Sequence, residues 1–176
     1  MQLTRAAYLA DFYVYPGLAL TLAALALAPG PRPWLALGVA AGAGLASWTL
    51  LEYVLHRWVF HHVPWICEQH DAHHRDPKAF VGTPTWLSLL AFSALVMAPS
   101  LVEWGVPVGC SFTAGLVLGY LWYVAVHYLV HHWHAAPGTA LSRLKRLHAI
   151  HHHRDATANF GVTTPVWDHV FRTRSR

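Results

Sequence analysis

Charged residues are scarce in this chain of 176 residues, because only 11% are Asp, Glu, Lys or Arg while 55% are hydrophobic. In soluble domains about a quarter of the residues are charged. The scarcity argues against an ordinary soluble domain and favours a membrane protein. Basic residues still outnumber acidic ones, which gives a formal charge of +4. They lie beside apolar runs, so we expect anionic lipid head groups, and not nucleic acid, as their partner.

Cysteine is nearly absent as well. The chain has two cysteines, Cys67 and Cys110, and neither belongs to a CxxC pair. This argues against a disulfide scaffold and against a thiolate zinc site. The first residues, MQLTRAAYLADFYVYPG, show no basic stretch followed by a short apolar core and a small-residue cleavage site. We therefore expect the first apolar run to be a retained helix rather than a cleaved signal.

What the chain does contain is a series of four long apolar runs. About 20 residues of helix are needed to cross a hydrocarbon layer of roughly 30 Å. The short segment from Gly105 to Pro107 between the third and fourth runs predicts an antiparallel helical hairpin. We predict an all-α, integral membrane, four-helix transmembrane bundle with a cytoplasmic histidine-rich helical cap. In a single domain of residues 1–176, the transmembrane helices are expected at about 12–28, 34–58, 84–104 and 108–131, and the cap at 132–176.

The basic residues indicate an orientation for this layout, because Lys and Arg accumulate on the cytoplasmic side of membrane helices. With four spans, Arg32 is the only one of the twelve basic residues on one side. The other eleven share a side with the histidine-rich regions and with both termini. The sequence therefore predicts a multi-pass membrane protein whose termini and histidines are cytoplasmic.

Histidine is the most informative residue type, with fifteen copies. Ten of them fall into four spaced groups: His56 and His61; His70, His73 and His74; His127 and His131; His148, His151 and His152. Residues three and four apart share a helical face, so we expect each HxxHH or HxxxH motif to direct its imidazoles to one point. Imidazole is the commonest metal ligand. Ten ligands exceed what one ion holds, so two metal ions are implied.

The first pair of histidines is spaced differently from the other groups. His56 and His61 are five residues apart, which turns them by about 140° on an α-helix with roughly 100° per residue. Both can serve one site only if the helix ends or bends near Phe60. The remaining histidines, His62, His132, His134, His153 and His169, fall outside the spacing, and we assign them to head-group contacts or to hydrogen bonds with the ligands.

Carboxylates are rare near the histidines, whereas soluble di-iron bundles take most of their ligands from glutamate. Glu52 and Asp71 are the nearest. Glu52 precedes His56 by one helical turn, and two interpretations stay open: a hydrogen bond that orients His56, or an ion pair with an arginine such as Arg57. Asp155, Asn159 and Asp168 are further candidates for supporting or substrate contacts, and Asp168 is equally suited to capping a terminal helix.

These residues resemble a known family. The motifs HRWVFH (56–61), HDAHH (70–74), HYLVH (127–131) and HAIHH (148–152) are similar to those of the fatty acid hydroxylase and sterol desaturase superfamily of membrane di-iron enzymes. The flanking segments LEYVLHR (51–57), HHRDPKAFVGTPTW (73–86) and NFGVTTPVWDHVFRT (159–173) resemble its hydroxylase branch. The resemblance covers about residues 51–173. It implies that the ten histidines in the four groups are the catalytic metal ligands.

The resemblance also implies a reaction, which is hydroxylation of a C–H bond of a lipid or fatty acyl chain. Two non-haem irons would be the cofactors, zinc is expected as a substitute in purified protein, and dioxygen would be the co-substrate. Electrons would come from a separate redox donor protein, because no fused electron-donor domain is present. A carotenoid ring hydroxylase and a lipid or sterol desaturase are the alternatives within this class, and a membrane metal transporter or sensor is the alternative outside it. The sequence leaves the oligomeric state open.

Overall fold

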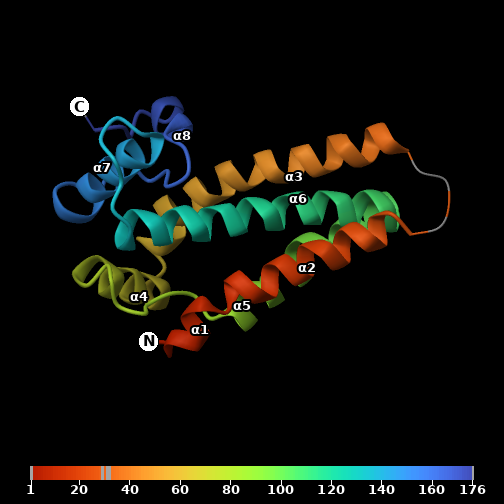
Figure 1. Cartoon of the computed structure of the whole chain (residues 1–176), viewed down its shortest axis with the longest axis horizontal. Coiled ribbons are helices and arrows are strands. Elements are labelled where there is room, and N and C mark those ends of the chain that lie inside the picture. Colours follow the sequence, from red (N-terminus) through yellow and green to blue (C-terminus); the bar gives the residue numbers. More distant parts are fainter. Residues whose placement is uncertain (1, 29, 31–32, 176) are drawn as a thin grey trace. The chain divides into compact units, whose positions relative to one another are not determined.

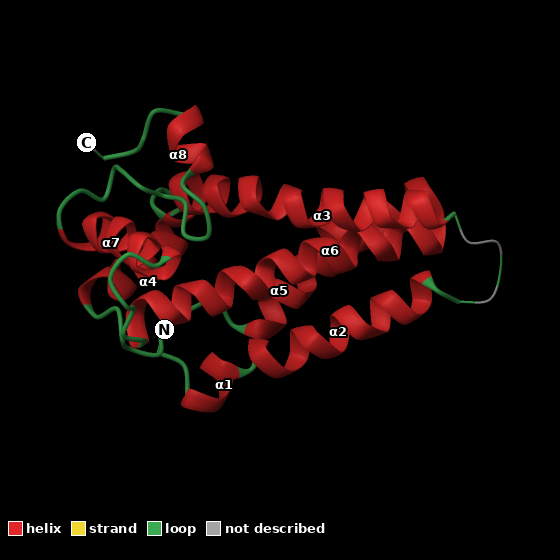
Figure 2. Cartoon of the chain, turned by 45° about the horizontal axis from the view of Figure 1, so that its top comes forward, coloured by secondary structure: helices red, strands yellow, loops and turns green. Residues whose placement is uncertain are grey.

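The computed structural model describes residues 2–28, 30 and 33–175, and its elements are all helical. The only pairing of extended backbone in the described ranges is an isolated bridge between Gln2 and Val81. Figure 2 accordingly shows helices joined by loops, with no strand in the part of the chain that is described. The expected all-α class is therefore confirmed. In chain order the helices are α1 (Arg5–Leu9), α2 (Asp11–Ala26), α3 (Trp34–Val54), the π-helix η1 (Leu55–Phe60), α4 (Pro64–Arg75), α5 (Thr85–Phe92), the π-helix η2 (Ser93–Met97), α6 (Ala98–His132), α7 (Ala140–His153) and α8 (Val166–Val170).

Three helical stretches are long and apolar enough to cross a membrane. They are Arg5–Ala26, Trp34–Phe60 and Thr85–His132. Apolar side chains on them are widely exposed, as at Leu35 and Val102, whose exposed fractions are 82% and 87%. Water would penalise so much apolar surface, whereas lipid would not. The chain is accordingly a membrane protein, and the predicted third and fourth spans both fall within the third stretch.

The third stretch does not run straight. Gly105 has φ 72° and ψ 173°, which is not helical and which glycine adopts without steric cost. The rings of Phe92 and Tyr120 lie 5.3 Å apart, although 28 residues of straight helix would separate them by about 42 Å. The chain therefore reverses direction at Gly105, where the sequence predicts a turn.

The chain divides into two compact units. We call residues 4–48 and 83–121 the helical unit, and residues 1–3, 49–82 and 122–176 the histidine unit. That all 176 residues form one domain stays a prediction. Within the helical unit, α2 and the parts of α3 and α6 that belong to it are long helices, visible in Figure 1.

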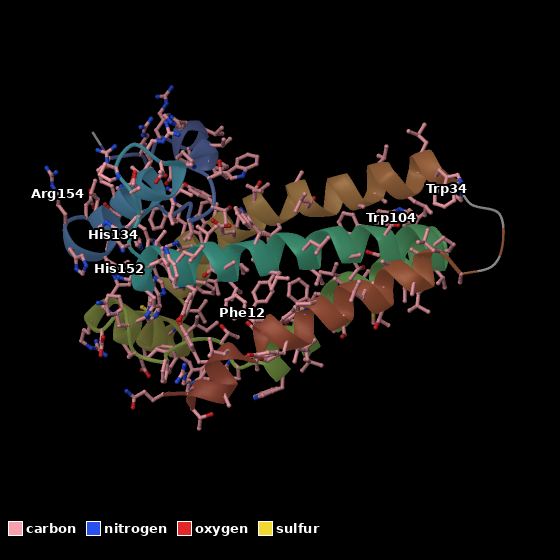
Figure 3. All side chains as sticks on the ribbon, in the orientation of Figure 1. Phe12, Trp34, Trp104, His134, His152 and Arg154 are labelled. Carbon is pink, nitrogen blue, oxygen red and sulfur yellow. The ribbon has the colours of Figure 1, made fainter. Side chains whose placement is uncertain are left out.

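Aromatic rings fill the core of the helical unit. Tyr15 of α2 contacts Phe92 at 5.7 Å and Tyr120 at 4.7 Å between ring centroids, and Trp48 of α3 contacts Tyr120 at 5.1 Å. The buried carboxylate of Asp11 accepts hydrogen bonds from the hydroxyls of Thr85 and Tyr120. These contacts join α2, α3, α5 and α6. At one end of this unit lie the exposed indoles of Trp34 and Trp104 (Figure 3), a placement typical of aromatic residues at a membrane interface.

The close approach of α3 to α6 depends on glycine. A Cβ added at Gly115 would lie 2.0 Å from the backbone oxygen of Ala41, and one added at Gly44 would lie 2.1 Å from that of Phe112. By contrast, a Cβ at Gly38 or Gly42 would meet nothing within 4 Å. Gly44 and Gly115 therefore permit the close approach of the α3 and α6 backbones, whereas Gly38 and Gly42 do not contribute to it.

This difference predicts the outcome of a matched pair of substitutions. Gly115→Ala should destabilise the protein by about 1 to 3 kcal/mol or more, because the new methyl group meets backbone atoms that cannot move aside. Gly42→Ala should leave stability unchanged or slightly raised, because alanine is the better helix former. Thermal unfolding of both variants in detergent measures the effect. Equal unfolding temperatures would contradict the described packing of α3 against α6.

Candidate metal centre

The π-helix η1 brings His56 and His61 together. Its hydrogen bonds join residues five apart, which widens the turn and returns residues at that spacing toward one face. The two imidazole rings accordingly stack, with centroids 5.3 Å apart and planes inclined by 19°. η1 ends at Phe60, and α4 begins at Pro64 as its first residue. The expected break near Phe60 is confirmed, and its physical form is a π-turn.

Each HxxHH motif serves two points instead of one. On a helix with roughly 100° per residue, position i+4 is turned by about 40° in one direction and position i+3 by about 60° in the other. On α4, His70 and His74 therefore face one cluster and His73 faces another. On α7, His148 and His152 share a cluster while His151 faces the other. The expectation of a single point for each motif is wrong for this reason.

The ten histidines singled out from the sequence form two clusters of five. Group 1 comprises His56, His61, His70, His74 and His151. Group 2 comprises His73, His127, His131, His148 and His152. Within each group the five candidate ligand nitrogens lie within 4.8 Å of one another. The other five histidines lie outside both groups. His134, for example, lies in the loop before α7, whereas His152 is on α7 itself (Figure 3).

In group 1 the imidazole nitrogens converge more closely than hydrogen bonding alone explains. The Nε2 atom of His70 lies 3.1 Å from that of His56, 3.2 Å from that of His61 and 3.1 Å from that of His74. A ring nitrogen carries at most one proton, so these contacts cannot all be good hydrogen bonds. A cation shared by the nitrogen lone pairs would account for the convergence.

Two histidines of group 1 have a defined tautomer. His56 Nδ1 lies 2.6 Å from the carbonyl oxygen of Phe160, and His151 Nδ1 lies 2.8 Å from that of Ala158. A carbonyl oxygen only accepts, so each Nδ1 carries the proton and donates it. In the neutral ring Nε2 is then left with a free lone pair directed into the group. Such outer hydrogen bonds are typical of metal-binding histidines.

Group 2 converges in a similar way. His131 Nε2 lies 3.2 Å from His127 Nε2 and 2.9 Å from His148 Nε2. His73 Nε2 and both ring nitrogens of His152 are buried without a hydrogen-bond partner in the described part of the chain. Buried polar atoms are seldom unpaired. Metal coordination would satisfy His73 Nε2 and one nitrogen of His152.

The surrounding backbone favours a cation over an anion. Histidines of both groups lie in the last turns of α4, α6 and α7. The carboxyl end of a helix carries partial negative charge, which stabilises a nearby positive charge. Nitrogen ligands from imidazole suit iron, zinc and copper. The residues present therefore fit two metal ions, one in each group.

Burial keeps these imidazoles neutral outside the membrane-spanning stretches. Desolvation, reinforced mainly by neighbouring histidines, lowers the pKa of His61 to about 4, that of His73 to about 4 and that of His151 to about 3. The same causes place the pKa of His148 well below its ordinary value. A neutral imidazole is the form that binds a metal. These imidazoles are thus in the metal-binding form at neutral pH.

The two groups have different surroundings. The ring of Phe160, which is 5% exposed, contacts the imidazoles of His56, His61 and His151 with centroids 5.4 to 5.7 Å apart and gives group 1 an apolar wall. Group 2 instead borders a cavity of about 300 Å³. Its walls include three histidines of the group, which are His131, His148 and His152, together with Lys78 and Lys145. Small molecules therefore have a route to group 2.

Some supporting residues differ from the sequence-based interpretations. The carboxylate of Glu52 forms its hydrogen bonds with neither His56 nor Arg57. It accepts them from the backbone N–H groups of Val162 and Thr163 and from the Thr163 hydroxyl. The guanidinium of Arg57 donates instead to the hydroxyl of Tyr53. Both interpretations of Glu52 assumed a partner on its own helix, whereas its actual partners are more than 100 residues away.

Asp168 and the loop before α8 also have roles that sequence reasoning left open or missed. Asp168 accepts hydrogen bonds from the backbone N–H groups of Phe160 and Gly161, so it binds the loop rather than the N-terminus of α8. The carbonyls of Phe160 and Ala158, which orient His56 and His151, could not be predicted from the sequence. They are backbone atoms, and no residue type marks them in a sequence.

Known proteins are similar to this chain. A family model described as fatty acid hydroxylase matches residues 41–173. The ceramide very long chain fatty acid hydroxylase of Saccharomyces cerevisiae is 34% identical over 145 residues, covering 74% of this chain and 36% of that protein. A dihydroceramide fatty acyl 2-hydroxylase of Arabidopsis thaliana is 30% identical over 156 residues, with coverages of 78% and 61%. For the fatty acid 2-hydroxylase of Homo sapiens the identity is 33% over 144 residues, with coverages of 74% and 38%.

The fold is similar to a solved structure as well. A structure described as full-length scs7p with only the hydroxylase domain visible superposes with a TM-score of 0.84 and 25% identity. The match covers 97% of this chain and 67% of that one. Against the three curated relatives named above, the chain spans 36% to 61% of their length. The match to residues 41–173, which include all ten clustered histidines, shows that the chain belongs to the fatty acid hydroxylase family.

Proposed function

We propose that this chain is a membrane-bound oxygenase that hydroxylates carbon 2 of a fatty acyl chain, with a ceramide-type lipid as the substrate class. The observation that carries the proposal is the pair of five-histidine clusters in a chain of this family. The names of the relatives support the acyl substrate and the 2-position. They favour it over a carotenoid ring, over desaturation and over metal transport.

The ten clustered histidines are the proposed ligands of two iron ions, one in each group. When bound, the irons would supply the activation of dioxygen that an unactivated C–H bond requires. In the overall reaction one oxygen atom enters the C–H bond. The other leaves as water after the uptake of two electrons and two protons, and a separate donor protein supplies the electrons. Zinc is expected in place of iron in purified protein, because nitrogen ligands bind it more tightly.

The protein's own contribution is orientation and exclusion of water. The backbone carbonyls of Ala158 and Phe160 hold His151 and His56 in the tautomer that directs Nε2 inward. The buried ring of Phe160 contacts His56, His61 and His151 and lines that side of group 1 with apolar surface, which water solvates poorly. Excluding water prevents side reactions of an oxidising centre. These features suit oxidation of a hydrocarbon chain.

The proposal includes four membrane crossings with the histidines and both termini on the cytoplasmic side. The reversal at Gly105 supports dividing Thr85–His132 into two antiparallel spans. An even number of spans leaves both ends of the chain on one side. The placement of eleven of the twelve basic residues on that side supports the cytoplasmic assignment.

Removing one ligand from each group tests the activity. His73→Ala and His151→Ala should each reduce turnover to below about one hundredth, because loss of a ligand disturbs the metal that the chemistry requires. His62→Ala and His153→Ala are the matched controls, since both are exposed neighbours of clustered histidines and should retain activity. The measurement is mass spectrometry of host lipids, with and without each variant, for a gain of one oxygen at carbon 2. Retained activity in either ligand variant would remove that histidine from the proposed site.

Metal retention should depend on pH in a way set by the lowered pKa values. Metal binds the neutral imidazole, so affinity falls only when pH drops through the pKa of the ligands. For His61, His73 and His151 that point is about 4 or lower. We expect the folded protein to keep its metal between pH 7 and about 5 and to release it near pH 4. A peptide of residues 146–154, with ordinary histidines, should lose metal around pH 6.5. Metal analysis after dialysis compares the two, and coincident release curves would contradict the expectation.

A further inference from the structure

One loop segment, residues 158–163 between α7 and α8, forms hydrogen bonds to two histidines of group 1 that come from different helices. Its carbonyl oxygens at Ala158 and Phe160 accept the Nδ1 protons of His151 and His56, at 2.8 and 2.6 Å. His56 belongs to η1 and His151 to α7, so the segment fixes ligands from two separate elements. The positions of these two carbonyls therefore determine where two imidazole lone pairs point.

Two buried carboxylates hold this segment through its backbone. Asp168 accepts hydrogen bonds from the N–H groups of Phe160 and Gly161, both at 2.9 Å. Glu52 accepts from those of Val162 and Thr163, at 2.6 and 2.8 Å. Four successive backbone donors, which no helix or strand would satisfy here, thus bind two side chains.

The fit around the segment is close. Glu52 is 3% exposed and Asp168 is 1% exposed, so both hydrogen-bonded carboxylates are shielded from water. A Cβ added at Gly161 would lie 2.9 Å from the carboxylate of Asp168 and 2.1 Å from the carbonyl oxygen of Thr164. Charge-assisted hydrogen bonds of this kind are roughly twice as strong as neutral ones. The segment is therefore held in a single position.

Group 2 lacks the equivalent support at one of its ligands. His148 directs Nε2 toward His131, and its Nδ1 atom is buried with no hydrogen-bond partner among the described residues. The Nδ1 atom thus has a backbone acceptor in His56 and His151 but none in His148. The two groups contain the same kind of side chain, but the backbone fixes the ring orientation at these two positions of group 1 and not at His148 of group 2.

We infer that Glu52 and Asp168 are positioning residues for the metal ion of group 1 alone, acting through the carbonyls of residues 158–163. The inference rests on the proposed function, because it presupposes a metal ion in that group. Neither carboxylate touches the ion or the substrate. Each acts by keeping a backbone segment where it orients His56 and His151.

The hydrogen-bond inventory predicts different effects for two isosteric substitutions. In Asp168→Asn one of the two carboxylate oxygens becomes an NH₂ group, so either Phe160 or Gly161 loses the acceptor of its N–H. In Glu52→Gln the amide oxygen still accepts from Val162 and Thr163, and the Thr163 hydroxyl can turn to accept from the NH₂ group. Asp168→Asn should therefore disturb the segment, and Glu52→Gln should preserve it.

The experiment is a titration of the metal-depleted full chain in detergent with Co²⁺, followed by visible absorption and metal analysis. Two backgrounds separate the groups: His131→Ala leaves group 1 intact, and His61→Ala leaves group 2 intact. We expect Asp168→Asn to weaken Co²⁺ binding about 10- to 100-fold in the first background and to leave it unchanged in the second. Glu52→Gln should resemble the parent in both. Equal weakening in both backgrounds would indicate a general structural role and overturn the inference, as would unchanged binding in the first.

The test distinguishes this inference from the proposed metal centre. If the unmodified chain does not bind two Co²⁺ ions, the metal centre itself is wrong, whatever the variants do. If Asp168→Asn does not fold, Glu52→Ala replaces it, since it removes three acceptor contacts that Glu52→Gln retains. Weakened group 1 binding in Glu52→Ala, recovered in Glu52→Gln, supports the inference, and identical binding in the two variants overturns it.

Discussion

The structure depends on one constraint, which is that a neutral imidazole has a single lone pair available to a metal and that this lone pair must point inward. In the histidine unit, ten rings are arranged so that they could meet this condition at once, because the candidate ligand nitrogens of each group lie within 4.8 Å of one another. Desolvation keeps the protons off, and for His56 and His151 a backbone carbonyl fixes which nitrogen carries the remaining proton. Without burial the rings would repel one another as cations below pH 6.5. The last turns of α4, α6 and α7 favour a positive charge beside the rings, the loop of residues 158–163 orients two of the rings, and the carboxylates of Glu52 and Asp168 hold that loop.

The arrangement of the ligands follows from helical angles. In an HxxHH motif on a helix, the histidines at positions i+3 and i+4 are turned about 100° from each other. They can therefore face two different points. α4 and α7 each use this difference in direction, so that neighbouring residues such as His73 and His74 belong to different groups. The stacked rings of His74 and His152, with centroids 4.1 Å apart, show how closely the two groups adjoin. Two short helices thus supply six of the ten clustered histidines.

Much of this could be predicted from the sequence, because the relevant information is local. Apolar runs predict long helices, Gly105 predicts a reversal, and the five-residue step from His56 to His61 predicts a departure from the α-helix. The ten clustered histidines could be singled out by their spacing together with the resemblance to a known family, because the five-residue step from His56 to His61 does not fit one face of an α-helix. The division of each HxxHH motif between two groups could not be predicted, because it depends on where the partner helices lie. The partners of Glu52 and Asp168 were equally inaccessible, since they are backbone N–H groups of a loop without regular structure.

The π-turn of η1 also separates two requirements that a continuous α-helix would couple. In a regular helix, rotating the apolar face of α3 would rotate every residue that follows by the same angle. The wider turn at Leu55–Phe60 introduces an offset between the apolar helix and the ligand at its end. The direction of His61 is therefore shifted, by a fixed angle, from the direction that the apolar face of α3 would otherwise give it. This shift lets a helix with a continuous apolar face end in two histidines, five residues apart, whose rings stack.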